Sequence, residues 1–138
     1  MRVVGLDLGG RRIGVAVSDA SGIVASPHSV LERRGDTATD HAAIAAVVAE
    51  LGAECVVVGI PLSLDGTVGP AASAVRDEIA ALAALLPVTL EAHDERFTTV
   101  TAERALTAQK VRARDRRRVV DKVAAAVILQ SWLDANRD

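Results

Sequence analysis

The stretch VVGLDLGGRRIGVAVSD, Val3–Asp19, predicts two adjacent strands joined by a tight turn. Apolar runs lie on either side of Gly9 and Gly10, and these glycines give the backbone the freedom that a short hairpin needs. Asp7 is the unusual residue, because a carboxylate inside so apolar a strand is costly to bury unless a metal ion, a basic side chain or a hydrogen-bond donor compensates it. The residues that can join Asp7 therefore bear most directly on function.

The composition is typical of one globular domain, residues 1–138. A chain of this length buries roughly two-thirds of its unfolded surface. Half of the residues are hydrophobic but only Phe97 and Trp132 are aromatic, so Ala, Val, Leu and Ile must form the core. Cys55 is the single cysteine, and we find neither a leader nor an apolar run of about 18 residues. We therefore expect a cytoplasmic protein with no membrane partner.

The order of the predicted elements indicates an α/β fold. Ile23–Leu31 is predicted as a third strand, irregular or at a sheet edge because it contains Pro27. Glu54–Ile60 is a continuous apolar run, typical of a strand buried on both faces in a parallel part of a sheet. The remaining predicted elements are a helix capped by Asp36 or Thr37, a helix over Ala71–Leu86, a strand over Val88–Ala92, a short helix after Thr98 or Thr99, and a last helix that starts among the arginines and ends near Asn136. We expect a five-stranded mixed sheet, with three leading antiparallel strands and two parallel ones, flanked by helices.

Polar residues follow the last predicted strand at once, as the sequence HDER at positions 93–96. Burying such charges is costly, so their place at the end of an apolar strand favours a cleft at the edge of the sheet. The alternative is a capping cluster in which the acids pair with Arg96. Because successive strand residues point to opposite faces, the sequence leaves open whether Asp94 or Glu95 faces Asp7.

Asp121 lies one position off the apolar stripe of the last helix. Ala124 and Ala125 follow one turn later, and their small side chains permit a close approach to the sheet. The simpler interpretation is that an acid near the start of a helix complements the helix dipole. The functional interpretation is that Asp121 meets Asp7 and Glu95.

A basic run lies at the start of the last helix, although the net charge of the chain is −2. Such a run is either a solvated loop and helix start, or a segment that contacts the phosphate backbone of a nucleic acid. One acid, Asp115, interrupts it. The basic residues are Lys110, Arg112, Arg114, Arg116, Arg117 and Arg118.

Three carboxylates, Asp7, Glu95 and Asp121, are what a two-metal phosphodiester nuclease requires. Two divalent ions about 3.5 to 4 Å apart need several hard oxygen ligands, so that one ion activates water and the other stabilises the leaving oxygen. The sequence has no cluster of histidine and cysteine that suggests zinc, which favours Mg²⁺ or Mn²⁺.

Four motifs, in order and over nearly the whole chain, resemble the YqgF-type family of pre-16S rRNA nucleases, which is also described as Holliday-junction-resolvase-like and belongs to the ribonuclease H-like superfamily. They are GLDLGGRRIGVAVSD (5–19), VVVGIPLSLDGTVGP (56–70), HDERFTT (93–99) and VVDKVAAAVILQSWLD (119–134).

The resemblance implies a ribonuclease H-like fold and a hydrolase, a two-metal-ion endonuclease of structured RNA that matures the 5′ end of 16S rRNA. It implies that Asp7, Glu95 and Asp121 are the catalytic and metal-binding residues, with Asp94 as the alternative ligand, and that Mg²⁺ or Mn²⁺ is the cofactor. Arg12, Arg96 and the basic run are then expected to bind the substrate. The ribosome is a further candidate partner, and both a monomer and a homodimer remain open.

Three other functions are compatible with the sequence. Cleavage of branched DNA, as by a Holliday-junction resolvase, would use the same charge-based backbone contacts. A non-catalytic nucleic-acid-binding regulatory factor would retain the acids without turnover. A phosphate-binding lobe of the sugar-kinase and actin type also carries an Asp-x-Gly turn in its first strand, but such proteins need two lobes and a much longer chain.

Overall fold

A computed structural model describes residues 1–63, 65–97 and 113–136, and of residues 97 and 113–120 it describes the backbone alone. The described residues form a five-stranded sheet in the order β3-β2-β1-β4-β5. The strands are β1 (Val3–Leu8), β2 (Arg12–Ser18), β3 (Ala25–Glu32), β4 (Cys55–Ile60) and β5 (Thr89–Asp94).

The sheet is mixed, as the sequence predicted. β1 pairs antiparallel with β2, and β2 pairs antiparallel with β3, whereas β4 runs parallel to both β1 and β5. β3 is an edge strand, and its pairing with β2 shifts register opposite Val15 and Ala16, next to Pro27. Every residue of β4 is buried, which is the pattern expected of a central parallel strand.

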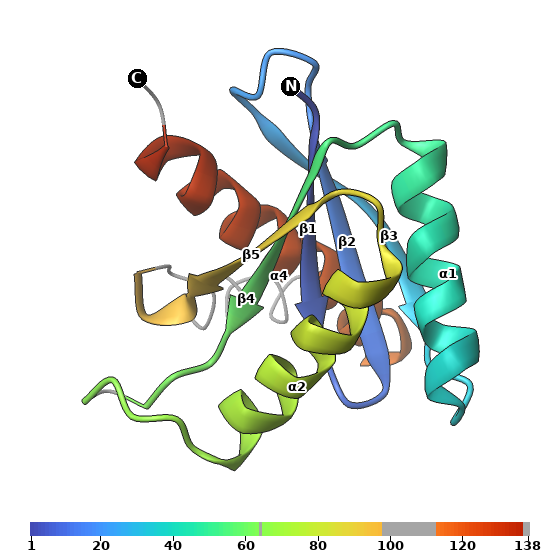
Figure 1. The fold of residues 1–138 in the computed structure, drawn as a ribbon, viewed down its shortest axis with the longest axis vertical. Coiled ribbons are helices and arrows are strands. Elements are labelled where there is room, and N and C mark those ends of the chain that lie inside the picture. Colours follow the sequence, from blue (N-terminus) through green and yellow to red (C-terminus); the bar gives the residue numbers. More distant parts are fainter. Residues whose placement is uncertain (64, 98–112, 137–138) are drawn as a thin grey trace.

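Helices cover both faces of the sheet (Figure 1). The helices α1 (Thr37–Glu50) and α2 (Pro70–Leu85) lie over one face, and the long helix α4 (Ala113–Ala135) lies over the other. Asp36 caps α1, since its carboxylate accepts a hydrogen bond from the backbone N–H of Ala38 at 3.3 Å. None of the helices in the described ranges is both long and apolar enough to cross a membrane.

The core is divided between the two faces because strand residues alternate. In β1, Val4 and Leu6 belong to the cluster under α1 and α2, whereas Val3 belongs to the cluster under α4. Small residues of α4, such as Ala124 and Ala125, are fully buried and let this helix lie close to the strands. Asp7 follows the same alternation as Val3 and therefore lies on the α4 face.

One boundary differs from the sequence-based expectation. β5 continues two residues past Ala92, and a single 3-10 turn, η1 (Glu95–Phe97), follows it at once. The helix α4 begins at Ala113, among the arginines as predicted, and this start places Asp121 beyond its first two turns. The dipole interpretation of Asp121 is wrong for that reason, because the effect is confined to the first turn.

Candidate active site

Asp7 is the buried acid at the centre of the candidate site. It lies near the end of β1, its residue is 8% exposed, and its register partner on β2 is Gly14. Directly paired residues of antiparallel strands lie about 4.5–5.5 Å apart between Cα atoms and point to the same face of the sheet. Whatever lies over Gly14 therefore lies beside the Asp7 carboxylate.

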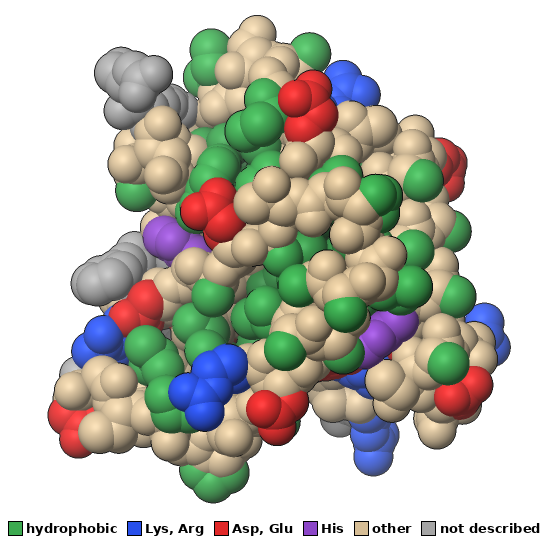
Figure 2. All heavy atoms as spheres, in the orientation of Figure 1, with side chains coloured by type: hydrophobic (Ala, Val, Ile, Leu, Met, Phe, Trp, Pro, Cys, Tyr) green, Lys and Arg blue, Asp and Glu red, His purple; other side chains and the backbone are tan. Residues whose placement is uncertain are grey.

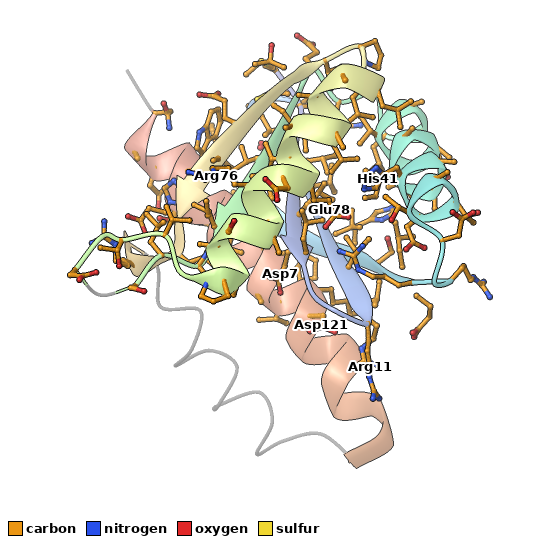
Figure 3. The ribbon with its side chains drawn as sticks, turned by 60° about the horizontal axis from the view of Figure 1, so that its bottom comes forward. Asp7, Arg11, His41, Arg76, Glu78 and Asp121 are labelled. Carbon is orange, nitrogen blue, oxygen red and sulfur yellow. The ribbon has the colours of Figure 1, made fainter. Side chains whose placement is uncertain are left out.

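The backbone of Asp121 lies over Gly14. A Cβ atom added to Gly14 would meet the carbonyl oxygen of Asp121 at 2.1 Å, so any larger residue would displace α4. Glycine inside a strand often marks such a close backbone approach. The missing side chain at Gly14 is thus what brings Asp121 next to Asp7, and Figure 3 shows the two acids near each other, on β1 and α4.

Glu95 lies on the other side of Asp7. The last registered pair of β1 and β4 is Leu6 with Val58. The next residues are Asp7 on β1 and Gly59 on β4. A Cβ atom added to Gly59 would lie 3.1 Å from the Cγ atom of Glu95. Two glycines therefore flank Asp7, and over each of them lies a segment that carries an acid.

Asp94 points away from this group. Its register partner is Ile60, which belongs to the core under α1 and α2, whereas Gly59 contacts Ile128 of α4. The Asp94 carboxylate accepts hydrogen bonds from the backbone N–H and side chain of Arg96, with an Nη2 to Oδ2 distance of 2.6 Å. These bonds hold the pKa of Asp94 below its usual value. The capping pair predicted as the alternative thus exists, but it involves Asp94.

Arg12 pairs with Asp121. The Nε atom of Arg12 donates to Oδ2 of Asp121 at 3.0 Å, and both side chains are partly buried. Arg12 shares the face of Gly14 because it lies two residues earlier on β2. The arginine therefore supplies a positive charge beside Asp121, on the face that also carries Asp7.

The donor set has the chemistry of a site for a hard divalent cation, because it consists of carboxylate oxygens. Within the described residues, however, no three His, Cys, Asp or Glu side chains are grouped closely enough to hold a metal ion. The Asp121 carboxylate is instead turned to Arg12. Asp7, Glu95 and Asp121 are the residues that could hold an ion on this face.

Two other titratable residues of this face, His93 and Cys55, have different partners. The Nε2 atom of His93 lies 2.9 Å from the Ser131 hydroxyl, and Ser131 is ten residues beyond Asp121, or roughly 15 Å along a helix. Burial lowers the pKa of His93. Cys55 is buried under α4, and burial, with a smaller effect from Glu91, raises the pKa of its thiol to about 11. Both residues belong to the packing of the α4 face.

The basic run lies only partly within the described structure. Residues 114 and 116–118 form the first turns of α4, and their side chains are not among those described. Positions 110 and 112 lie outside the described residues, as does the short helix predicted after Thr98.

A second polar group, which the sequence analysis missed, lies on the opposite face. Arg33, His41 and Glu78 come together there from the end of β3, from α1 and from α2. Sequence patterns gave no sign of it, because each residue stands alone on its own element. Figure 3 shows His41 and Glu78 between the two helices, away from Asp121.

The fold is of the ribonuclease H-like class. The structure of T. thermophilus RuvC in complex with Holliday junction substrate superposes with a TM-score of 0.59 at 16% identity, covering 98% of this chain and 94% of that one. A second Thermus thermophilus RuvC structure gives a TM-score of 0.55. The fold predicted from the sequence is thereby confirmed.

The sequence also matches the RuvX family, described as Holliday junction resolvase, over residues 1–135, and the chain belongs to this family. A relative from Myxococcus xanthus is 48% identical over 99% of this chain and 90% of its own, and one from Geobacillus kaustophilus is 42% identical over 99% and 100%. Both carry the name "Putative pre-16S rRNA nuclease". The resemblance to that family is confirmed.

Proposed function

We propose that this chain is a metal-dependent endonuclease that hydrolyses phosphodiester bonds in structured RNA, and that its substrate is the precursor of 16S rRNA at the 5′ end. One observation carries the proposal. Gly14 and Gly59 flank the buried Asp7, and over them lie the backbone of Asp121 and the side chain of Glu95, so three distant segments each bring an acid to one face of the sheet. The names of the full-length relatives support the RNA substrate.

In this proposal Asp7, Glu95 and Asp121 hold Mg²⁺ or Mn²⁺. The bound ions would activate water and stabilise the leaving oxygen. Asp7 is rigidly placed in a buried strand, which suits a ligand that must keep its position. Glu95, and not Asp94, is the acid from the HDER segment, because Asp94 lies on the other face and is paired with Arg96.

Two groups of basic residues would bind the substrate. Arg12 orients the Asp121 carboxylate through a charge-assisted hydrogen bond and is close enough to the acids to contact a phosphate next to the cleaved bond. Arg96 is exposed at the edge of the same end of the sheet, and the basic run from Lys110 to Arg118 would bind the backbone without reading its sequence. These contacts make the affinity depend on salt.

The test is cleavage of an end-labelled pre-16S rRNA fragment and of a four-way DNA junction in parallel, with Mg²⁺ or Mn²⁺. Asp7→Asn keeps the size of the side chain and removes its charge, so we expect the cleavage rate to fall by more than about 100-fold. Asp77→Asn is the matched control, because Asp77 is an exposed acid of α2 on the other face. Equal cleavage by Asp7→Asn and wild type would contradict the proposed site.

Branched DNA is the second candidate substrate, favoured by the description of the family and by the likeness in fold to RuvC. Cleavage of the DNA junction alone would show that the protein is a resolvase of branched DNA and not an RNA nuclease. If neither substrate is cut while the protein still binds RNA and metal, it is a regulatory binding factor.

A further inference from the structure

Arg33, the first residue after β3, holds the tip of the β1–β2 hairpin from both sides. Its backbone N–H donates to the carbonyl oxygen of Arg11 at 2.9 Å, and its side-chain Nε donates to that of Gly9 at 2.7 Å. Gly9 comes two residues after Asp7, and Arg11 immediately precedes Arg12. The two bonds therefore fix the backbone that joins the central acid of the candidate site to its arginine.

The other end of the Arg33 guanidinium is fixed by α2 and α1. Its Nη1 and Nη2 atoms donate to the two carboxylate oxygens of Glu78, each at 2.8 Å. His41 lies 2.9 Å from one of these oxygens. The three side chains are 18% (Arg33), 16% (Glu78) and 7% (His41) exposed. This planar, bidentate geometry belongs to arginine, and lysine cannot reproduce it.

Side-chain packing supports the hairpin tip only weakly. A hollow of about 630 Å³ opens beside Gly9 and Gly10, and Arg33, His41 and Glu78 line it. A Cβ atom added to Gly10 would meet nothing within 4 Å. Figure 2 views the face that carries α1 and α2 and shows hydrophobic side chains gathered over these helices. Within the hairpin, the Gly9 N–H donates to the carbonyl oxygens of Asp7 (3.1 Å) and Arg12 (3.0 Å). The hydrogen bonds of Arg33 add a polar link from the tip to α2.

We propose that Arg33 is a positioning residue for the carboxylate site: it fixes the hairpin tip so that Asp7 and Arg12 keep their places on the α4 face, and Glu78 and His41 hold Arg33 in turn. The inference rests on the proposed function. Metal ligands must stay within about 0.5 Å of their productive positions, and losing a residue that orients a ligand typically weakens metal affinity by about 10–100-fold.

The experiment titrates Mn²⁺ into the full-length protein by calorimetry. Arg33→Gln keeps a polar side chain but loses the fork to Glu78, and we expect Mn²⁺ to bind about 10–100-fold more weakly, with faster hydrogen exchange at the Gly9 amide. Arg33→Lys is not expected to restore the affinity. Arg34→Gln is the matched control, because Arg34 is exposed and its described bond is made by its backbone N–H to Asp40.

If Arg33→Gln does not fold, Glu78→Gln is the second test variant. This substitution leaves Arg33 in place and weakens the hydrogen bonds that hold its guanidinium. If the melting temperature of these variants falls while their Mn²⁺ affinity and kcat stay at wild-type values, Arg33 has a structural role only and the inference is overturned. Asp7→Asn separates the two proposals. Unchanged Mn²⁺ binding by Asp7→Asn contradicts the proposed function, whereas loss in Asp7→Asn with normal binding in Arg33→Gln contradicts this inference alone.

Discussion

Gly14→Ala is the substitution that most directly tests how the candidate site is built. The new Cβ atom would lie 2.1 Å from the carbonyl oxygen of Asp121, whereas ordinary contact begins at 3.4 Å. The difference, about 1.3 Å, must be absorbed by moving α4 away from β2, because the clashing atom is backbone and no side-chain rotation relieves it. Overpacking of this kind costs about 1–3 kcal/mol, which corresponds to a fall of roughly 3–12 °C in melting temperature for a chain of this size.

The same displacement separates Asp121 from Asp7. A misplacement of about 1 Å at a reacting centre can reduce the rate by about 100-fold, so we expect activity to fall further than stability explains. The assays are thermal unfolding, Mn²⁺ titration and cleavage at a temperature where the variant is fully folded. Gly10→Ala is the control, because a Cβ atom there meets nothing within 4 Å and Gly10 is not among the described glycines with positive φ. A Gly14→Ala variant with wild-type stability and cleavage would refute the reasoning.

Two further predictions concern titratable groups. Burial raises the pKa of Glu78, but hydrogen bonds from Arg33 and His41 outweigh burial and hold that pKa below 4.5. The ionised Glu78 carboxylate therefore stabilises the fold above pH 4.5, and this stabilisation is lost as the pH falls through the lowered pKa. Glu78→Gln should destabilise the protein at pH 7, by about 1–3 kcal/mol in urea unfolding, and the gap to wild type should narrow below pH 4.5; a gap that is constant with pH would contradict this. The Cys55 thiol, with a pKa of about 11, should have roughly one thiolate in a thousand at pH 8, so a thiol reagent should modify it at that pH only as fast as the protein opens. Rapid labelling of the folded protein would show that the residue is accessible.

Local sequence patterns predicted the elements that depend on neighbours in the chain. The hairpin after Val3, the buried strand that ends at Ile60 and the cap at Asp36 were all correct, because apolar runs and capping side chains act over a few residues. The role given to Gly9 and Gly10 was wrong, because neither has a positive φ. The family was identified correctly from four motifs, and the structural likeness to RuvC agrees with the fold it implied.

The sequence also singled out three acids on segments that the fold places at one face of the sheet. Asp7 was notable because a buried carboxylate is costly, and the HDER segment and Asp121 were notable as acids beside apolar elements. Sequence reasoning could not choose between Asp94 and Glu95. Pairing of Asp94 with Ile60 fixes its face, and the turn after β5 brings Glu95 to the other one.

The sequence by itself thus determined the five strands, the three long helices of the described residues, the family and the candidate acids, since each follows from short-range patterning or from motifs. The tertiary structure alone decided which side chains meet. The contact of Gly14 with Asp121 and the link from Arg33 to Glu78 join residues far apart in the chain, and such contacts depend on sheet register and on how closely a helix approaches its strands. Local propensity does not determine either contact, because both depend on how distant elements pack against one another.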